Sequence, residues 1–342
     1  MKAIVFHQHG GPEVLQYTDA AVPTLRANEV LVRVRACALN HLDLWVRGGL
    51  PNVPIPLPHI PGSDIAGEIA QVGTQVSTVK VGQKVVLAPG VSCGKCTACI
   101  TGLDNRCRQF SNLGYMIDGG CAEFVRCPEV NCLPYPENLT FEEAASIPLV
   151  FQTAWHMLIT RAQLQPGEGV LILGAGSGVG SAAIQIAAMF GARIIATAGN
   201  EAKLEKAKQL GAAHLINHKT RKIRDEVRRI TNKRGVDVVV EHVGTATWDE
   251  SVASLAVGGR LVTCGATTGY DAKIDLRVLF ARQLSLLGSY MGVKSELVTV
   301  LKLVASGQLQ PVIDRVFTLS ACADAHRYLE TGEQFGKVVL TV

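Results

Sequence analysis

Gly169-Val-Leu-Ile-Leu-Gly174-Ala-Gly176-Ser-Gly178-Val-Gly180 is a short apolar run that continues into a turn with four alternating glycines. The apolar run predicts a buried strand, and the uncharged stretch 180–190 predicts a helix directly after the turn. Glycines in such a turn let the backbone approach a pyrophosphate, which then lies at the positive end of the helix. Because the turn stands between a strand and a helix, it favours a dinucleotide site over a glycine turn with a packing role alone.

Apolar strands and helices alternate along the chain after this turn. Further strands are expected at 193–197, 237–241, 259–264 and 285–289, with helices at 201–210 and 296–305. This alternation predicts a parallel sheet with helices on both faces, which is a doubly wound α/β fold. The first third differs, because short strands such as the alternating stretch 29–36 predict a β-rich domain. Thr140 and Glu143 have the spacing of a capping box, so a helix is expected to begin there.

The composition is that of a globular chain with large buried cores. The 342 residues are 48% hydrophobic and 18% charged, and this length favours two domains. The net charge of +4 is too small to indicate a nucleic-acid partner. Residues 169–192 carry no charge, but glycines interrupt them, so a membrane span is not expected. No secretory leader is recognisable, and a reducing cytoplasm is the expected location.

Four cysteines follow one another with the spacing C-x2-C-x2-C-x7-C. They are Cys93, Cys96, Cys99 and Cys107. Four thiolates from one loop can form a tetrahedral shell, which leaves no open position and therefore indicates a structural rather than a catalytic metal. The sequence predicts one structural zinc, whose binding energy would fold the loop. A pair of disulfides or a redox-active cysteine pair is the alternative, although the short gaps and the intracellular composition do not favour it.

The end of the second expected strand bears on the choice of cofactor. An NAD site favours a carboxylate there, which binds the ribose 2′-hydroxyl, whereas this chain has Ala198, followed closely by Asn200. No acid would repel a 2′-phosphate, and Lys203 is near, so the sequence favours NADP(H) over NAD(H). His218 is a further candidate contact. The stretch 219–234 holds eight Lys or Arg and two acidic residues. These basic residues either form a solvated helix face or attract phosphate modestly.

Several segments together resemble the medium-chain dehydrogenase/reductase superfamily, which includes zinc alcohol dehydrogenases and quinone reductases. Four segments resemble the quinone-reductase branch. They are Gly10-Gly-Pro-Glu-Val-Leu-Gln-Tyr17, Gly62-Ser-Asp-Ile-Ala-Gly67, Gln152-Thr-Ala-Trp-His156 and the closing Gly336-Lys-Val. The cysteine segment resembles the structural-zinc loop of the alcohol dehydrogenases. Over essentially the whole chain, the resemblance implies a GroES-like catalytic domain at 1–150 with a zinc lobe at 92–108. It further implies a Rossmann cofactor domain at 151–288 and a return segment at 289–342 that completes the first domain.

The chain departs from the alcohol dehydrogenases where those enzymes hold a catalytic zinc. Matching the motifs places Asn40 at the first ligand, Ser63 at the histidine of a Gly-His-Glu segment, and Leu149 near the third ligand. An amide, a hydroxyl and an alkyl group do not replace thiolate and imidazole ligands. The sequence therefore predicts that catalytic zinc is absent. A metal site rebuilt from other residues is the alternative, and its candidate ligands are Cys37, His41, His59 and Asp64.

The resemblance also implies which residues act on substrate and cofactor. Without metal, hydrogen bonds must stabilise a developing oxyanion, and Asn40 is the expected donor. The other expected residues of the catalytic site are Asp43, which would orient the cofactor or the loop, and Ser63 and Asp64. The expected cofactor contacts are Thr153, Gly174, Ser177, Gly178, Val179, Gly180, Asn200, Lys203, His218, Val243, Gly265, Ala266, Thr267, Ser289, Tyr290 and Lys337. No residue stands out as the proton donor, for which Tyr115, His41 and bulk water are candidates.

These observations predict an NADPH-dependent reductase that transfers hydride to a carbonyl or to a conjugated double bond, as in an enone or a quinone. One alternative is an alcohol dehydrogenase with a rebuilt metal site. Another is a protein that binds NADPH without turnover. The expected partners are small carbonyl, enone, quinone or alcohol molecules, and neither nucleic acid nor a membrane. A homodimer or homotetramer is expected, because an exposed edge strand at 285–289 requires cover.

Overall fold

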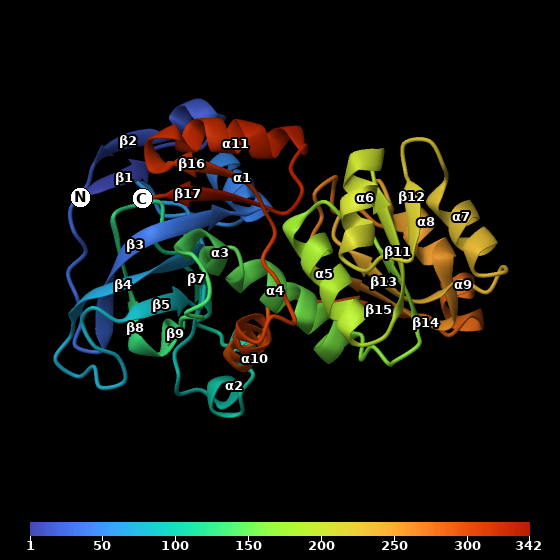
Figure 1. Cartoon of the computed structure of the whole chain (residues 1–342), viewed down its shortest axis with the longest axis horizontal. Helices are drawn as coiled ribbons and strands as arrows, with labels where there is room; N and C mark the ends of the chain where they lie inside the picture. Colours follow the sequence, from blue (N-terminus) through green and yellow to red (C-terminus); the bar gives the residue numbers. More distant parts are fainter. The chain divides into compact units, whose positions relative to one another are not determined.

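The computed structural model describes residues 1–342 and divides them into two compact units. Unit 1 consists of Met1–Leu149 together with Val293–Val342, and unit 2 consists of Val150–Gly292. Both chain termini lie in unit 1 (Figure 1). The last fifty residues therefore belong to the same compact unit as the first half of the chain.

Unit 2 is built on a six-stranded parallel sheet with the order β12-β11-β10-β13-β14-β15. Its strands are β10 (Gly169–Ile172), β11 (Arg193–Ala198), β12 (His214–Asn217), β13 (Val236–Glu241), β14 (Leu255–Thr263) and β15 (Ser285–Gly288). The strands β11 and β12 lie on one side of β10, and β13, β14 and β15 lie on its other side, so the strand order reverses at β10. The glycine turn directly follows β10, at the switch point where sheets of this kind bind ligands.

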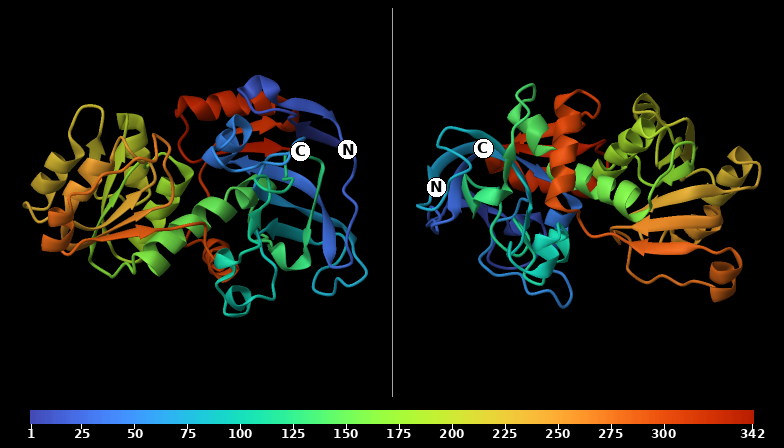
Figure 2. Two further views of the ribbon diagram at one scale, coloured as in Figure 1. Left: turned by 180° about the vertical axis from the view of Figure 1, so that it is seen from behind. Right: turned by 90° about the horizontal axis from the view of Figure 1, so that it is seen from below.

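Helices connect the strands of unit 2 and pack against the sheet (Figure 2). They are α4 (Pro148–Trp155), a π-helix η4 (His156–Arg161), α5 (Gly178–Met189), α6 (Glu201–Gln209), α7 (Ile223–Ile230), α8 (Trp248–Ser254) and α9 (Leu276–Ala281). All four residues of β10 are buried, as the apolar run at 169–172 predicts. The predicted doubly wound α/β fold is confirmed.

Unit 1 contains a seven-stranded sheet in which β16-β17-β3-β4-β5-β9 form the main order and β8 pairs with β3. Its strands are β3 (Glu29–Leu39), β4 (Asp64–Val72), β5 (Lys84–Leu87), β8 (Phe124–Pro128), β9 (Cys132–Pro134), β16 (Ile313–Thr318) and β17 (Lys337–Thr341). Two further strand pairs are β1 (Lys2–Val5) with β2 (Gln16–Asp19), and β6 (Gly90–Val91) with β7 (Ser111–Asn112). The closing strand β17 pairs antiparallel with β3 and thereby joins the chain end to the first domain core.

Most helices of unit 1 are short, whereas α10 (Lys294–Ala305) has 12 residues. The others are α1 (His41–Gly48), α2 (Thr97–Ile100), α3 (Phe141–Ala145), α11 (Cys322–Thr331) and the 3-10 turns η1 (Pro12–Val14), η2 (Asp104–Arg106), η3 (Glu129–Asn131) and η5 (Leu319–Ala321). The capping box expected at Thr140 is present, because Thr140 Oγ1 accepts from the Glu143 amide at 3.2 Å and Glu143 accepts from the Thr140 amide at 2.8 Å.

Several regular elements were not predicted from the sequence, among them β12, α7, β16 and α11. Each is short or strongly charged, so its apolar periodicity is weak. In α11, for example, only Cys322, Ala325, His326 and Leu329 are buried. None of the helices combines the length and the apolar character that crossing a membrane requires.

Candidate functional site

The four cysteines of the zinc lobe, residues 92–108, are brought together in unit 1. Their sulfur atoms all lie within 4.8 Å of one another, with Cys93 and Cys99 at 3.9 Å and Cys96 and Cys99 at 3.6 Å. Sulfurs bound tetrahedrally at about 2.3 Å from zinc lie about 3.8 Å apart. The cysteines therefore fit a four-sulfur zinc site, and the distances exceed those of a disulfide bond.

Backbone amides of the lobe stabilise thiolates. The amides of Lys95 and Cys96 lower the pKa of Cys93 to about 6. Cys107 Sγ accepts hydrogen bonds from the amides of Cys93 at 3.5 Å and Gln109 at 3.3 Å. Because the thiolate is the form that binds zinc, these amides prepare the loop for a cation.

The lobe is attached to the rest of unit 1 by a lysine at the start of α10. The Lys294 amide donates to Asp104 Oδ1 at 3.1 Å, and Lys294 Nζ donates to Gly90 O at 3.2 Å. Apart from such contacts the lobe has little to support it, because Ile100 is 71% exposed and α2 has four residues.

A second group of polar residues lies where three neighbouring strands of unit 1 begin or end. Asn40 follows β3, Asp64 begins β4 and Lys337 begins β17. The sheet order β17-β3-β4 places these strands side by side, and the registers pair Val338 with Leu39 and Asp64 with Ala38. The pairing of the three strands thus brings residues from both ends of the chain to one edge of the sheet.

These three side chains form a closed triangle, here called the Asn40–Asp64–Lys337 cluster. Lys337 Nζ lies 2.9 Å from Asp64 Oδ2 and 2.5 Å from Asn40 Oδ1, and Asn40 Nδ2 donates to Asp64 Oδ2 at 3.0 Å. The other carboxylate oxygen, Asp64 Oδ1, accepts from the Leu149 amide at 2.8 Å. Lys337 and Asp64 are 3% and 0% exposed. The positions matched to catalytic zinc ligands in the relatives are therefore next to a buried ion pair.

Asp43 supports the loops that carry this cluster. Its Oδ2 accepts from the Asn40 amide at 2.7 Å and its Oδ1 from the Gly62 amide at 3.0 Å. Burial raises the pKa of the Asp43 carboxyl, and the hydrogen bond from Asn40 opposes that rise. In the structure Asp43 therefore orients loops rather than presenting a free carboxylate.

The expectation that Asn40 donates a hydrogen bond to an oxyanion stays a prediction, and in the structure its side-chain amide already has protein partners. Asn40 Nδ2 donates to Asp64, with Ala38 O at 3.5 Å as a second, long contact. The amide is occupied because the carboxylate of Asp64 lies on the neighbouring strand. Ser63, by contrast, has a buried hydroxyl without a hydrogen-bond partner.

The four residues considered for a rebuilt metal site do not converge. Cys37 Sγ lies 3.9 Å from Cys121 Sγ, His59 Nδ1 lies 3.6 Å from Asp118, and the His41 ring lies edge-on to Trp45. Asp64 is paired with Lys337. Each candidate ligand thus contacts a different neighbour. The one close group of three or more metal-ligating side chains is that of the four lobe cysteines.

The glycine turn of unit 2 has the geometry that a pyrophosphate requires. Gly174 has φ +56°, and Ser177 Oγ caps α5 by accepting from the Gly180 amide at 2.8 Å. Gly178, Val179 and Gly180 form the first turn of that helix. The amides at the start of α5 are therefore available to an anion at the positive end of the helix.

Two residues at the end of β13 were missed by sequence reasoning: His242 holds the glycine turn, and Glu241 holds the loop that follows β13. His242 Nε2 lies 2.9 Å from Leu173 O and 3.4 Å from Ser177 Oγ, and burial lowers the pKa of His242. Glu241 accepts from the amides of Val243 at 2.9 Å and Gly244 at 3.0 Å. A Glu-His pair directly after an apolar strand was the available signal.

Gly180→Ala is expected to destabilise unit 2 by about 1–3 kcal/mol and to weaken dinucleotide binding at least tenfold. A Cβ at position 180 would lie 2.3 Å from Gly174 O, so that the helix must move away from the turn. Thermal unfolding and titration with NADPH measure the two effects. Gly191→Ala is a comparison for backbone strain alone, because its Cβ meets nothing within 4 Å while φ is +70°. Unchanged NADPH affinity in Gly180→Ala would contradict the assignment of this turn to dinucleotide binding.

The end of β11 gathers polar and basic groups. Ala198 is buried there, and Asn200 Oδ1 caps α6 by accepting from the Lys203 amide at 2.9 Å. His218 Nε2 and Lys219 Cε lie 3.3 and 3.1 Å from the place that a Cβ on Gly199 would occupy. Burial lowers the pKa of His218, and Lys219 and Lys203 lower it further. This group is called the β11-end cluster: Asn200, Lys203, His218 and Lys219.

The remaining expected cofactor contacts lie in several places of unit 2. Val243, Gly265, Ala266 and Thr267 lie around the loop after β13, where Thr267 Oγ1 donates to His242 O at 3.2 Å. Thr153 lies on α4, and Ser289 and Tyr290 follow β15. The hydroxyls of Thr153 and Ser289 are buried without a partner. Lys337 belongs to unit 1 and is held in the Asn40–Asp64–Lys337 cluster.

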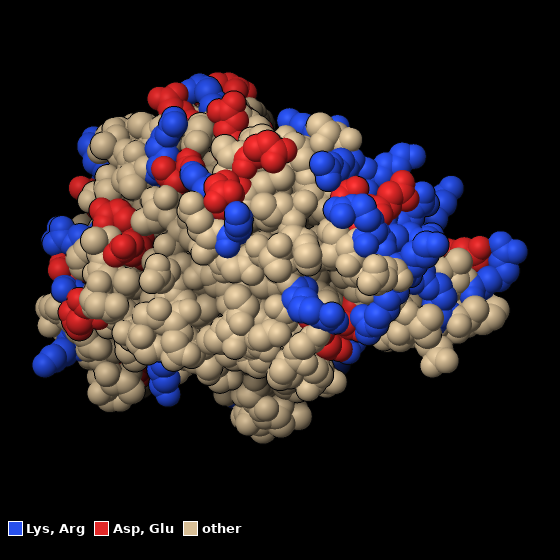
Figure 3. Space-filling model, turned by 45° about the vertical axis from the view of Figure 1, so that its right-hand side comes forward, with Lys and Arg blue, Asp and Glu red and all other residues tan.

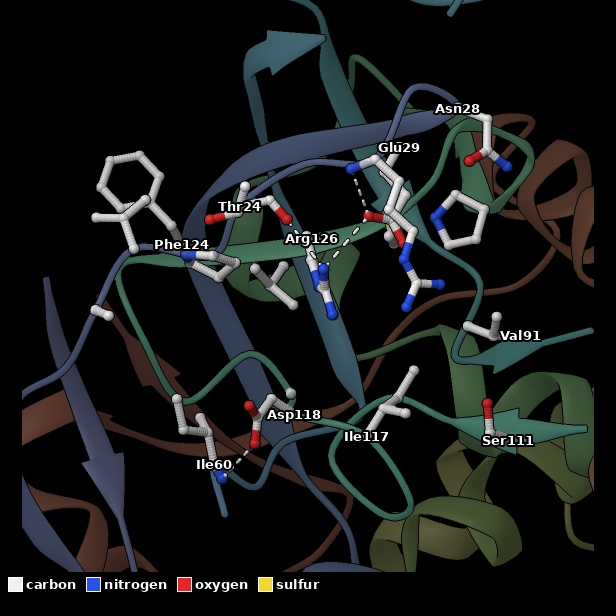
Figure 4. Close-up of a pocket in the computed structure, with 18 of the residues that line it drawn as sticks. Thr24, Asn28, Glu29, Ile60, Val91, Ser111, Ile117, Asp118, Phe124 and Arg126 are labelled. Atoms are coloured by element: carbon white, nitrogen blue, oxygen red, sulfur yellow. Dashed lines mark hydrogen bonds and ion pairs between the residues drawn. The ribbon is translucent and has the colours of Figure 1, made fainter. Parts of the chain in front are cut away.

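A pocket of about 710 Å³ opens elsewhere in unit 1 and contains none of the expected site residues (Figure 4). Arg126 and Asp118, two of its charged side chains, have hydrogen-bond partners among the lining residues. Arg126 donates to Thr24 O at 2.9 Å and lies 3.7 Å from Glu29, and Asp118 accepts from the Ile60 amide at 3.0 Å. The pocket therefore offers no converging reactive groups.

A glycine turn on a doubly wound sheet and a four-cysteine lobe in a β-rich unit define a class: nucleotide-dependent dehydrogenases and reductases. Two family models match the chain, "Alcohol dehydrogenase GroES-like domain" at residues 26–137 and "Zinc-binding dehydrogenase" at residues 178–306. The chain belongs to the medium-chain dehydrogenase/reductase superfamily. This confirms the family and the GroES-like and Rossmann folds expected from the sequence.

Individual relatives come from both branches of the superfamily. Quinone oxidoreductase of Homo sapiens is 30% identical, with 99% of this chain and 97% of that protein covered. NAD-dependent alcohol dehydrogenase of Sulfolobus acidocaldarius is 34% identical, with both chains fully covered. A solved structure of an NAD-dependent alcohol dehydrogenase is 47% identical over both full chains, with a TM-score of 0.96. These relatives support oxidoreductase activity for the chain.

Proposed function

We propose that the protein is an NADPH-dependent reductase that acts on a small carbonyl, enone or quinone without a catalytic metal. The observation that carries this proposal is the Asn40–Asp64–Lys337 cluster, in which an ammonium and a carboxylate pair at 2.9 Å beside Asn40, a position that the resemblance matches to a catalytic zinc ligand. A lysine ammonium is a fixed positive charge and not a metal ligand. A cation bound beside it would be repelled, so the cluster disfavours a second zinc.

Unit 2 would bind the cofactor through the turn after β10. When bound, the reduced nicotinamide supplies a hydride. Amides at the start of α5 would bind the pyrophosphate, and Ser177 and His242 keep the turn in shape for it, because Ser177 caps the helix and His242 contacts Leu173 O. A hydroxyl at Thr153 is buried without a partner and is free to bind a polar group of the cofactor.

Preference for NADPH rests on the β11-end cluster. Ala198 leaves no carboxylate at the strand end, and Lys203, His218 and Lys219 surround the loop that follows it. Figure 3 shows lysine and arginine side chains gathered on one side of the molecule, and both α6 and α7 carry basic residues in their last turns. Positive potential of this kind favours the additional phosphate of NADPH.

Lys219→Glu is expected to raise the KM for NADPH by about ten- to hundredfold, because a charge-assisted hydrogen bond contributes about 1.5–3 kcal/mol. The KM for NADH should change by less than about threefold. Steady-state kinetics with both cofactors check this. Lys208→Glu carries the same charge change in the last turn of α6 and should leave both constants near their original values. Equal loss for NADH and NADPH would refute a 2′-phosphate contact at Lys219.

The proposed function is tested by NADPH oxidation with a panel of quinones, enones and aldehydes, together with zinc per chain. We expect turnover with at least one substrate class, about one zinc per chain, and turnover that resists a chelator too weak to remove the lobe zinc. Tight NADPH binding with no turnover of any substrate would leave a binding protein instead.

A second candidate is an alcohol dehydrogenase with a catalytic metal, which the 47% identity to an NAD-dependent alcohol dehydrogenase favours. Metal-dependent oxidation of alcohols, lost on chelation and restored by zinc, together with about two zinc ions per chain, would distinguish it. The metal-free reductase predicts that one zinc per chain is retained at full activity.

We also propose that two copies associate through unit 2. The strand β15 is an edge of the parallel sheet, and edge strands require cover. Leu276 and Phe280 on the adjacent α9 are 66% and 70% exposed. A homodimer in light scattering, dissociated by Phe280→Glu, would support this interface.

A further inference from the structure

The buried ammonium of Lys337 has a hydrogen-bonding capacity that its neighbours do not exhaust. An ammonium carries three N–H donors. Asn40 Oδ1 at 2.5 Å and Asp64 Oδ2 at 2.9 Å take two of them. One N–H remains for a further acceptor. The side chain is 3% exposed, so any acceptor that reaches it meets the charge with little water between them.

Asn40 and Asp64 prevent the lysine from turning away. Both of their acceptor atoms face Nζ, and Asn40 Nδ2 also donates to Asp64 at 3.0 Å, so the three groups fix one another. Asp64 is held in turn by the Leu149 amide at 2.8 Å. The amide of Asn40 is held by Asp43 at 2.7 Å. Both residues that position Lys337 are therefore held by further hydrogen bonds of their own.

A second unsatisfied donor is adjacent in sequence. Ser63 is fully buried, and its hydroxyl has no hydrogen-bond partner. A buried hydroxyl without a partner is costly, and its retention indicates a ligand atom or an ordered water. Ser63 directly precedes Asp64, whose carboxylate holds the lysine. Two donors, one of them charged, therefore belong to the same edge of the sheet.

We infer that Lys337 is the cation that stabilises the negatively charged oxygen of the substrate, in the role that a metal ion has in zinc relatives. This inference deepens the proposed function and rests on it. Asp64 and Asn40 are positioning residues that hold the ammonium.

The step balances without a metal. The substrate gains hydride at its electrophilic carbon, and the electron pair of the double bond moves to the oxygen, directly in a carbonyl or through conjugation in an enone. The cofactor is oxidised by two electrons. Lys337 donates a hydrogen bond to the negatively charged oxygen and keeps its proton. Water from the solvent supplies the proton that completes the product.

The test compares Lys337→Met with the wild type in three measurements. The kcat for the reduced substrate should fall about 100- to 1000-fold, the loss that follows removal of one oxyanion donor. The Kd for NADPH, from fluorescence titration, should stay within about twofold. In Lys337→Ala, short primary ammonium ions should restore part of kcat, which a merely structural role of the lysine would not allow.

Two further variants keep the inference falsifiable if the single change impairs folding. Lys337→Met with Asp64→Asn removes both charges at nearly constant volume, and it should fold while remaining inactive. Asn40→Ala should lower kcat about tenfold with no change in NADPH affinity and no rescue by ammonium ions. Lys84→Met, an exposed lysine on β5 of the same sheet, is the matched control and should retain full kcat.

A readout without turnover separates this inference from the proposed function. 4-Nitrophenol should bind the NADP⁺-loaded protein as its phenolate, seen by absorbance, and Lys337→Met should lose this binding. Phenolate binding that depends on Lys337 in a protein without reductase activity would refute the reaction and retain the anion site. Full kcat in Lys337→Met would refute the inference and retain the reaction. A parallel loss of NADPH affinity would assign Lys337 to cofactor binding instead.

Discussion

Replacing Cys99 with serine is expected to abolish zinc binding and to unfold the lobe at residues 92–108. The sulfur of Cys99 lies 3.9 Å from that of Cys93 and 3.6 Å from that of Cys96, so the substitution leaves three of the four sulfur ligands. Structural zinc in small peptides contributes about 10–16 kcal/mol of apparent binding free energy at pH 7. Little else holds this loop, because its helix α2 has four residues and no buried residue. Zinc per chain should fall from about one to near zero.

Hydrogen exchange and limited proteolysis measure the local unfolding. Amides of the lobe should become unprotected and cleavage should begin there, while unit 2 keeps its affinity for NADPH. Cys132→Ser is the matched control, because Cys132 is partly exposed and lies outside the lobe, near Cys127 at 3.8 Å. Full zinc content in Cys99→Ser would mean that the four thiols are not the ligand set.

Asp64→Ala is expected to lower the free energy of unfolding by about 3–5 kcal/mol, because it leaves the ammonium of Lys337 buried without its partner. The pair is 3% and 0% exposed, so water does not compensate for the loss. The Leu149 amide also loses its acceptor. Urea unfolding followed by circular dichroism and fluorescence measures the change for the unit that contains the pair.

The exposed pair of Lys2 and Asp19 provides a control with the same separation. Their charged atoms are also 2.9 Å apart, but the side chains are 44% and 78% exposed. Asp19→Ala should therefore cost only a small part of what Asp64→Ala costs. Asp64→Leu combined with Lys337→Met should recover most of the stability, because it removes both buried charges. Equal effects of Asp64→Ala and Asp19→Ala would mean that the cluster is hydrated in solution.

Local patterns in the sequence predicted most of the fold. The glycine turn at 174–180, the apolar strand before it and the capping box at Thr140 all lie within a few residues of the partners they act on. Strand and helix limits were mostly within one or two residues, as for α5, expected at 180–190 and found at Gly178–Met189. The elements that were missed, such as α7 with its many charges, are stabilised by their place in the sheet rather than by their own sequence.

The zinc lobe could be predicted from the sequence, whereas the contacts of Lys337 could not. Four cysteines within fifteen residues must lie close together in the fold, because a short loop cannot place them far apart. Asn40 and Lys337, in contrast, are 297 residues apart in sequence. Their contact depends on β17 pairing with β3, and on the register that brings the two positions together.

The sequence by itself therefore determined the superfamily, the α/β fold, the dinucleotide turn and the four-cysteine lobe, since each depends on patterns of residues that are close together in the sequence. Only the tertiary structure decided which side chains contact Asn40. Asn40 looked like a free donor in the sequence, and strand pairing made it a partner of Asp64 and Lys337. A side chain's hydrogen-bonding capacity is set by its residue type, but whether that capacity is free depends on which distant strands fold against it.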